Sequence, residues 1–290
     1  MDMRKQDRRD GRALVAPMAA MLTGMLAFPL LVDIVYSLSR VTFETLRAPV
    51  FDGFGNYAAV VSDPAFWSAF WFSLRFGLLA ALAQVAAGLF LAVFLAPLID
   101  RRPWLMALLM LPMMVAPALV GLMYRLVLHE FIGPVPYYLQ LWTGDSPSFL
   151  GGGNAFRTLV VVEILQWTPF AILILYSAYK AIPEEVREAA RIDGAGPLKL
   201  FRLIELPLLA PTMAMVFFMR FIAGFRVFDN VYTLTGSGAG GSTTSLSIYI
   251  YLAFFKEGSI GKAVAASILL LLASFVFVVA LDRLSGRPAA

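Results

Sequence analysis

The 290-residue sequence contains no cysteine and a single histidine. Without cysteine the chain forms neither disulfide bonds nor thiolate metal sites, although this absence does not fix a compartment. An enzyme acting inside a membrane would need clustered histidine, aspartate or metal ligands, so we expect no catalytic site and no metal site. Charged residues make up only 14% of the sequence, whereas about a quarter is typical of a soluble domain.

Hydrophobic residues make up 60% of the chain, and the mean hydropathy is +0.79. They gather in six apolar segments of about 20 residues, the length that an α-helix needs to cross roughly 30 Å of hydrocarbon. Because backbone groups in lipid must bond within their own segment, we expect these segments to be helices. The predicted spans are Ala13–Tyr36, Trp67–Ala96, Trp104–Leu128, Thr158–Tyr179, Leu208–Thr233 and Ala263–Leu281. The expected fold class is therefore an all-α membrane protein with six transmembrane helices.

The basic residues outside these spans are unevenly distributed, which predicts the orientation of the chain. If both termini share a side, the loops on that side carry Arg4, Lys5, Arg8, Arg9, Arg12, Arg101, Arg102, Lys180, Arg187, Arg191, Lys199, Arg202, Arg283 and Arg287. The opposite loops carry Arg40, Arg47, Arg157, Lys256 and Lys262. We therefore expect both termini in the cytoplasm. This asymmetry accounts for the net charge of +4 without a nucleic-acid partner. The first apolar run is too long for a signal peptide, so we expect a span there.

Polar side chains inside spans are costly, so each is a candidate for function. Glu163, Gln166, Trp167 and Phe170 recur at helical spacing on one face of the fourth span. Aromatic faces together with hydrogen-bonding groups suit a sugar ring, which has apolar C–H faces and many hydroxyls. Trp167 with Pro169 is equally compatible with a helix kink that touches no solute. The sequence leaves both interpretations open.

The fifth predicted span contains a second set of polar residues. Arg220 lies about 18 Å from its cytoplasmic end at 1.5 Å per residue, near the middle of the bilayer. An arginine there costs roughly 2.5–3.5 kcal/mol on insertion scales unless it meets water or an acid. We expect Arg220 and Asn230 to face a polar cavity and not the lipid. Arg226 and Asp229 can instead brace a subunit interface.

The segment 181–207, here called the EAA loop, is charged and rich in small residues. Pro183, Glu184 and Glu185 are typical of a helix start, and Gly194 is a natural stop. Pro197 then opens a second short helix that we expect to end before Pro207. Two short helices with a small-residue bend form either a solvated connector or a docking surface.

The spacing of this loop resembles the EAA signature of bacterial ABC-transporter permeases. The matching residues are Glu188, Ala189, Ala190, Gly194, Ile204, Leu206 and Pro207, with Asp193, Ala195 and Phe201 matching the fuller version seen in sugar importers. The segments NYAAVVSDPAFWSAFWFSLRF, WTPFAILILYSAYKAIPEEV and FRVFDNVYTLTGSG are similar to carbohydrate permeases that form the first half of a heterodimeric channel. The closest resemblance is to the shorter six-helix members.

The resemblance implies a type I importer permease in a bacterial inner membrane, with a transmembrane domain at 13–281 between cytoplasmic tails at 1–12 and 282–290. It also implies a second homologous permease, two ATPase subunits that use ATP and Mg, an extracytoplasmic solute-binding protein, membrane lipid and a carbohydrate solute. The sequence has no G-x-x-x-x-G-K-[ST] motif, so we expect no cofactor bound by this chain and no ATP hydrolysis by it. The implied coupling residues are Glu188, Ala189, Ala190, Asp193, Gly194, Ala195, Phe201, Ile204 and Pro207.

A gradient-driven secondary transporter of a small polar solute is the alternative class. Its expected signs are broken helices in two matching halves, or paired buried carboxylates. Neither sign is evident in the sequence. The solute itself stays open, because neutral and anionic sugars both fit, and the partner permease can hold the main solute site.

Overall fold

A computed structural model describes residues 3–236 and 242–284, with side chains for 15–236 and 242–279. The elements are α1 (Met3–Ser37), β1 (Ser39–Arg40), β2 (Val50–Phe51), α2 (Gly55–Val61), α3 (Pro64–Arg101), α4 (Trp104–Met114), α5 (Pro117–Val127), α6 (Pro134–Thr143), α7 (Ala155–Lys180), α8 (Glu184–Ile192), α9 (Pro197–Leu200), the π-helix η1 (Phe201–Glu205), α10 (Leu206–Phe225), α11 (Asp229–Thr235), α12 (Leu246–Phe255) and α13 (Ile260–Leu284). Three parts of the sequence lie outside this description. They are the side chains of the basic residues before Ala13, the residues 237–241, and the part of the predicted tail beyond Leu284.

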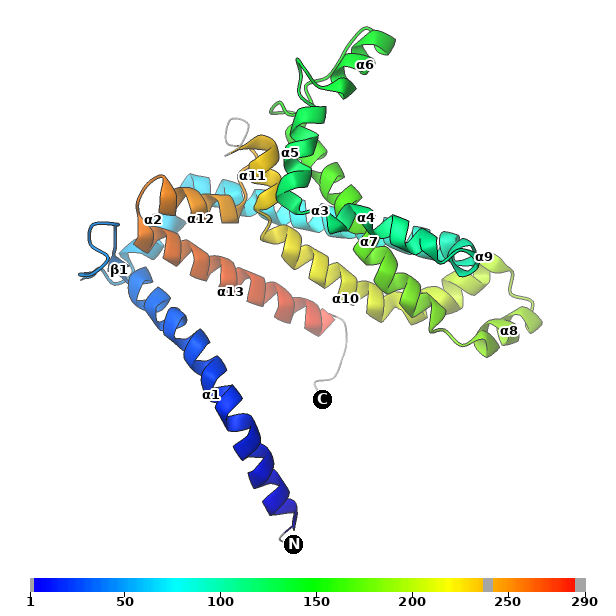
Figure 1. The fold of residues 1–290 in the computed structure, drawn as a ribbon, viewed down its shortest axis with the longest axis horizontal. Helices are drawn as coiled ribbons and strands as arrows, with labels where there is room; N and C mark the ends of the chain where they lie inside the picture. Colours follow the sequence, from blue (N-terminus) through cyan, green and yellow to red (C-terminus); the bar gives the residue numbers. More distant parts are fainter. Residues whose placement is uncertain (1–2, 237–241, 285–290) are drawn as a thin grey trace. The chain divides into compact units, whose positions relative to one another are not determined.

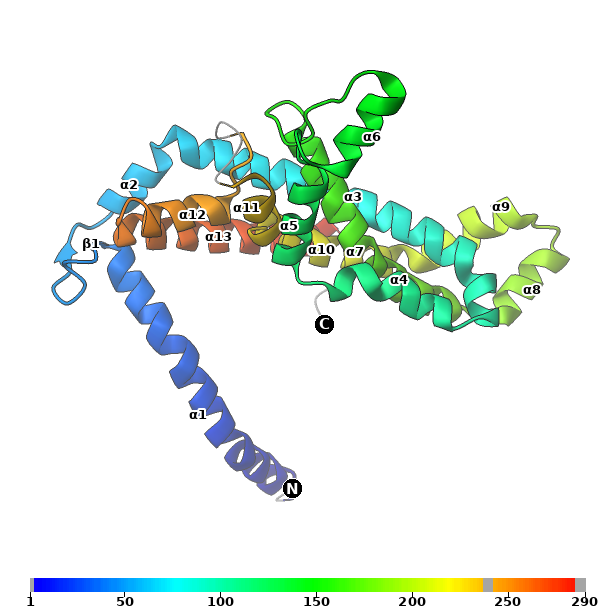
Figure 2. The same cartoon turned by 45° about the horizontal axis from the view of Figure 1, so that its top comes forward.

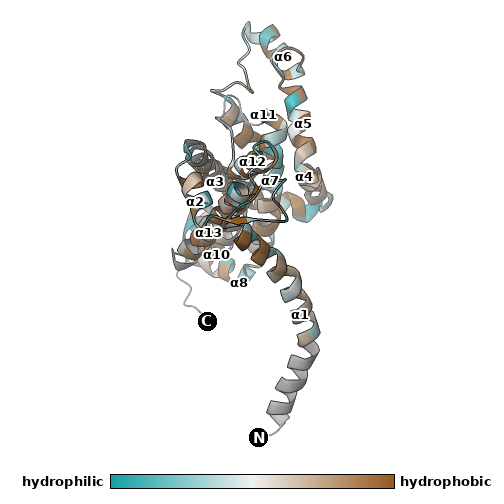
Figure 3. Ribbon diagram, turned by 90° about the vertical axis from the view of Figure 1, so that its left-hand side faces the viewer, coloured by the Kyte–Doolittle hydropathy of each residue, from teal (hydrophilic) through white to brown (hydrophobic). Residues whose placement is uncertain are grey.

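The predicted helical membrane fold is confirmed. Within the described residues, five helices are long and apolar enough to cross a membrane, or six if one bent pair counts as a single span. The five are Val15–Ser37, Pro64–Arg101, Ala155–Lys180, Pro197–Phe225 and Ile260–Val279. Figure 3 shows hydrophobic residues predominating along α10. The strands β1 and β2 add a two-residue antiparallel ladder that the sequence did not predict.

The third predicted span, Trp104–Leu128, is wrong as a continuous helix. The helices α4 and α5 meet at a bend of 82°. Val115 and Ala116 are extended at the break, with ψ of 134° and 135°. The cause is Pro117, because a proline ring disfavours helical geometry at the residue before it.

The fifth predicted span, Leu208–Thr233, is also interrupted. The helix α10 ends at Phe225, and α11 begins at Asp229. Two hydroxyls bond to the carbonyls freed at this break: Ser247 Oγ donates to Arg226 O at 2.9 Å, and Ser245 Oγ donates to Val227 O at 2.6 Å. Irregular backbone at membrane depth is tolerated where protein groups satisfy it in this way.

The second short helix of the EAA loop does not end before Pro207. The helix α9 runs through η1 directly into α10. Pro207 is the second residue of α10, directly after η1. Pro197–Phe225 is therefore one long element, and its inner end belongs to the EAA loop.

The chain forms two compact units, and the first comprises residues 1–63 and 250–269. Asn56 Nδ2 donates to Ser37 O at 2.9 Å and to Ser39 O at 2.8 Å, which fixes the end of α1 against the β1–β2 ladder. In Figure 1, α1 ends beside this ladder. The amide of Ile260 donates to Val41 O at 2.9 Å, so the start of α13 is tied to the same loop.

The second unit comprises residues 64–249 and 270–290, and α3, α7 and α10 form its core. Figures 1 and 2 show α7 crossing α3. Buried Val85, Leu175 and Val216 contribute to one hydrophobic cluster of this unit. The helices α3 and α10 approach closely at Gly77, where an added Cβ would lie 2.9 Å from Phe225 N and 3.0 Å from Phe221 O. Small residues allow such backbone contact between membrane helices.

This contact predicts a difference between two glycines. Gly77→Ala forces α3 away from the backbone of α10, so we expect a loss of about 1–3 kcal/mol, as in other overpacked sites. In contrast, Gly24 in α1 has nothing within 4 Å of its would-be Cβ. Gly24→Ala should be neutral or stabilising through helix propensity. Thermal stability of the two variants in detergent checks this, and equal behaviour contradicts it.

Candidate functional site

Five polar side chains meet inside the second unit, and we call them the central polar cluster. They come from α3, α7, α10 and α11, and each is at most 5% exposed. The members are Gln84, Glu163, Gln166, Arg220 and Asn230. Polar groups buried to this degree need partners, because an unpaired one is costly in a medium of low dielectric constant.

Arg220 is the centre of the cluster. Its Nη2 donates to Glu163 Oε1 at 2.8 Å, and its Nε donates to Gln84 Oε1 at 2.8 Å. The guanidinium also lies over the Trp167 ring, with 4.3 Å from Cζ to the ring centroid. Such a cation–π contact contributes about 2 kcal/mol or more when it is desolvated. Arg220 therefore binds α10 to both α3 and α7.

Asn230 and Gln166 extend this network to the broken helices. Asn230 Nδ2 donates to Glu163 Oε2 at 2.8 Å and to Gln166 Oε1 at 2.9 Å. Gln166 Nε2 donates to Val115 O at 3.1 Å, the carbonyl freed where α4 ends. The Oδ1 atom of Asn230 is buried and has no hydrogen-bond partner among the described residues.

Two cavities adjoin the cluster. The smaller has a volume of about 220 Å³, and Glu163, Trp167, Arg220 and Asn230 form part of its wall. The larger has a volume of about 470 Å³, lies at the break between α4 and α5, and is mostly apolar except for Gln166 and Tyr124. The larger volume is within the range of small-molecule sites in proteins.

The six residues predicted for the solute path are all at this place. The structure brings Glu163, Gln166, Trp167, Phe170, Arg220 and Asn230 together from three elements, with Phe170 at 6.0 Å from the guanidinium of Arg220. Sequence reasoning missed Gln84. Its signal was available, since Gln84 is a polar residue within the otherwise apolar second span.

Arg226 and Asp229 do not join the central polar cluster. Both side chains are exposed, and both border the smaller cavity. In the described part of the chain, no ion pair connects them. The described residues also contain no group of three or more His, Asp or Glu side chains that could hold a metal ion.

The EAA loop bends at Gly194, which has a φ of +77°. The amide of Ala195 donates to Ala190 O at 2.9 Å, and the amide of Gly194 donates to Arg191 O at 3.1 Å. This pair of bonds is a Schellman motif, which places a glycine in the left-handed region after a helix. An added Cβ at Gly194 would meet nothing within 4 Å. A glycine is thus favoured at position 194 because of the left-handed backbone conformation there. Steric crowding inside this chain is not the reason.

The residues predicted for coupling fall into two groups. The exposed ones form the outer surface of the loop: Glu188, Ala189, Asp193, Gly194 and Pro207. The buried or half-buried ones pack beneath it: Ala190, Ala195, Phe201 and Ile204. The loop therefore presents an exposed surface of small residues, supported from beneath by packed side chains. This geometry is compatible with docking of another protein.

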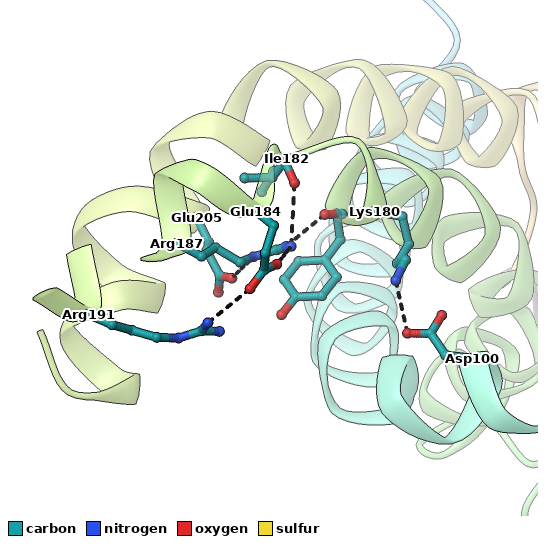
Figure 4. A network of polar contacts seen from close by, with 8 residues as sticks. Asp100, Lys180, Ile182, Glu184, Arg187, Arg191 and Glu205 are labelled. Atoms are coloured by element: carbon teal, nitrogen blue, oxygen red, sulfur yellow. Dashed lines mark hydrogen bonds and ion pairs between the residues drawn. The ribbon is translucent and has the colours of Figure 1, made fainter. Parts of the chain in front are cut away.

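Arg187, which the sequence interpretation treated only as a loop cation, is the main polar contact under this surface (Figure 4). It is 8% exposed, and its Nε donates to Glu205 Oε1 at 2.9 Å. Burial opposes its charge, but hydrogen bonds to Glu205 and Glu184 outweigh burial and hold the pKa of Arg187 above its usual value. The hydrogen bonds from Arg187 and Arg191 lower the pKa of Glu184.

A helical bundle with buried polar side chains, broken spans and an exposed loop at one end defines a polytopic membrane protein of the transport class. The family model of the binding-protein-dependent transport system inner membrane component matches residues 84–289. The chain belongs to this family of multi-pass membrane components, and it is a permease component of a binding-protein-dependent ABC transport system.

Two curated relatives support this assignment. The chain is 31% identical to the probable ABC transporter permease protein y4oQ of Sinorhizobium fredii over 87% of this chain and 82% of the relative. It is 30% identical to the trehalose/maltose transport system permease protein MalF of Thermococcus litoralis over 95% of this chain and 94% of the relative.

A solved structure supports the fold. The chain superposes on a crystal structure of a bacterial ABC transporter involved in the import of the acidic polysaccharide alginate, with a TM-score of 0.84. The match covers 100% of both chains at 20% sequence identity. The six-helix importer permease fold expected from the sequence is therefore confirmed.

The central polar cluster predicts a strong asymmetry between single and double variants. Arg220→Met leaves the Glu163 carboxylate buried without its cation, a change that destabilises proteins by about 3–5 kcal/mol. Arg220→Met combined with Glu163→Gln removes both charges and should regain more than half of that loss. Thermal unfolding in detergent measures both variants. A double variant no more stable than the single one contradicts this prediction.

The left-handed bend predicts which residues can replace Gly194. Gly194→Leu imposes about 1–2 kcal/mol of strain on the turn and should uncouple transport while membrane insertion stays intact. Gly194→Asn should retain more transport, since asparagine adopts this conformation more readily. Gly196→Leu is the size control, because Gly196 has a φ of −68°. ATP-driven uptake in vesicles checks the order, and normal uptake by Gly194→Leu contradicts it.

Proposed function

We propose that this chain forms half of the translocation pathway of an ATP-driven importer for a carbohydrate or sugar derivative. The observation that carries the proposal is the wall of the smaller cavity. It is formed in part by Trp167, Arg220 and Asn230, with the Arg220 guanidinium lying over the Trp167 ring. The relative from Thermococcus litoralis is named for trehalose and maltose transport, which supports a carbohydrate solute.

The chemistry of this wall matches that of a sugar. A pyranose presents apolar C–H groups on its ring faces, which stack on aromatic rings such as that of Trp167. Its hydroxyls both donate and accept hydrogen bonds, so they can pair with polar side chains of this wall. The Arg220 guanidinium offers further N–H donors beyond the two used for Glu163 and Gln84.

The energy for transport comes from elsewhere in the proposed assembly. This sequence has no Walker A motif, so we assign ATP and Mg to two separate ATPase subunits and no cofactor or catalysis to this chain. The exposed part of the EAA loop docks on one of these subunits. A second permease completes the pathway, and an extracytoplasmic binding protein delivers solute. With the positive-inside pattern, both termini are cytoplasmic.

A gradient-driven transporter is the second candidate, and the two broken spans favour it. Discontinuous helices beside a buried polar site occur in such proteins, and here the breaks lie at Val115–Ala116 and Arg226–Phe228. The family assignment favours the ATP-driven mechanism. Depleting ATP while holding the ion gradient separates the two mechanisms, because only the importer stops.

The decisive experiment purifies the chain with its partner subunits, reconstitutes the complex and screens sugars for binding-protein-dependent stimulation of ATPase activity. Stimulation by at least one sugar is expected. Failure of any ATPase to co-purify would falsify the proposed assembly. An assembled complex that responds to no sugar would overturn the carbohydrate assignment alone.

A variant of the cavity wall tests the solute contact directly. Trp167→Ala should raise the transport KM by about 5- to 30-fold, which corresponds to a lost ring contact of about 1–2 kcal/mol. Trp104→Ala is the matched control, since Trp104 is exposed at the start of α4. Uptake of the stimulating sugar is measured for both. An unchanged KM for Trp167→Ala contradicts its contact with solute.

A further inference from the structure

The helices α3, α7 and α10 are joined by polar contacts at two levels. One level is the central polar cluster, where Gln84, Glu163 and Arg220 meet. The other lies near the EAA loop. There, Tyr176 Oη donates to Asp100 Oδ1 at 2.7 Å and Lys180 Nζ pairs with Asp100 Oδ2 at 2.9 Å, which ties α7 to α3. Figure 4 shows the contact between Lys180 and Asp100 beside the Arg187 network.

Arg187 connects the remaining elements at the second level. Its Nη2 donates to Tyr179 O at 2.9 Å and its Nη1 to Ile182 O at 3.4 Å, which bonds α8 to the end of α7. Its Nε pairs with Glu205 Oε1 at 2.9 Å, at the end of η1 and directly before α10. The ring of Tyr179 lies 4.6 Å from the guanidinium carbon. One side chain therefore holds three elements in a fixed geometry.

Glu205 is in an unusual backbone segment. It is the last residue of η1, a π-helix that continues directly into α10. Single π-turns inside helices are rare and occur frequently at functional sites. Glu205 is 4% exposed, and Arg220 follows it by 15 positions along the same element, about 22 Å away at 1.5 Å per residue.

We propose that the Arg187–Glu205 ion pair is a positioning device that makes α8 and α10 move together, so that displacement of the EAA loop reaches Arg220. This inference rests on the proposed function, because it takes the EAA loop to be the surface on which an ATPase acts. The docking residues Glu188, Ala189 and Gly194 are exposed, whereas the pair lies beneath them. The exposed residues thus bind the ATPase, whereas the buried ion pair passes the movement on to α10.

Stability alone is a weak reason for such a pair. Buried ion pairs are often replaceable by apolar residues without loss of stability, whereas their bond geometry fixes one arrangement. The pair Arg191–Glu184 offers a contrast, because both side chains are more than half exposed. Exposed pairs of this kind contribute little and hold no defined geometry. Of these two ion pairs, the Arg187–Glu205 contact is therefore the one suited to pass a movement of α8 on to α10.

The absence of native cysteine allows a direct measurement on the whole complex. Ala223 is exposed and lines the smaller cavity, so Ala223→Cys serves as the reporter. The rate of maleimide labelling of this chain is measured in the reconstituted complex with and without ATP. With the ion pair intact, ATP is expected to change the rate by about fivefold or more, the lower end of typical coupling between sites.

Three backgrounds test the pair: Arg187→Met, Glu205→Met, and the double variant Arg187→Met with Glu205→Met. Each single variant leaves one charge of the pair without its partner and should lose the ATP-dependent change. The methionine pair keeps the site apolar and packed, so it should assemble but transmit less than half of the response. Assembly is followed by co-purification of the partner subunits.

Three results would overturn the inference. The first is an ATP response in either single variant equal to that of the parent. The second is a methionine pair that assembles and transmits the full ATP response. The third is a parent complex that hydrolyses ATP without any change at Ala223→Cys. The labelling needs no sugar, so it tests the ion pair separately from the solute. A normal labelling response without sugar-stimulated ATPase activity would count against the proposed solute alone.

Discussion

The ion pair between Arg220 and Glu163 is the interaction on which the arrangement of the second unit depends. Arg220 is 5% exposed and Glu163 is 2% exposed. An unpaired charge buried to this degree is strongly destabilising, because little water is present to solvate it. Once they pair, their remaining hydrogen-bonding groups need partners as well. Gln84 from α3 and Asn230 from α11 supply them. One buried cation thus determines how four elements are placed.

The same requirement explains where the helices break. A bend in lipid exposes carbonyl groups that must be satisfied by protein, and each break lies where polar side chains are available. Val115 O accepts from Gln166, a member of the central polar cluster, and Val227 O accepts from Ser245. Both cavities adjoin these breaks. The irregular backbone and the polar cluster therefore form one feature, in which bent spans leave space beside buried polar groups.

Much of this could be predicted from the sequence, because hydropathy and helical spacing are local signals. The face of Glu163, Gln166 and Trp167 follows from positions in one helix, and Gly194 is a helix stop by its own conformational freedom. The partners of these residues could not be predicted. Gln84 meets Arg220 across 136 positions, and Arg187 meets Glu205 across 18. No periodicity encodes such pairings. The break before Pro117 could have been predicted from the proline itself. It was missed because the segment Trp104–Leu128 is apolar along almost its whole length.

A bundle joined in this way cannot move its helices independently. Sliding α10 along α7 would separate Arg220 from Glu163, leaving two buried charges without partners at a cost of several kcal/mol. Two routes avoid that cost. Either α7 and α10 move as one body, as the second level of contacts at Asp100, Arg187 and Glu205 favours, or new partners replace the old ones during the movement. The need to keep every buried charge paired therefore limits which helices can move independently, and it is the same requirement that determines how the helices are placed.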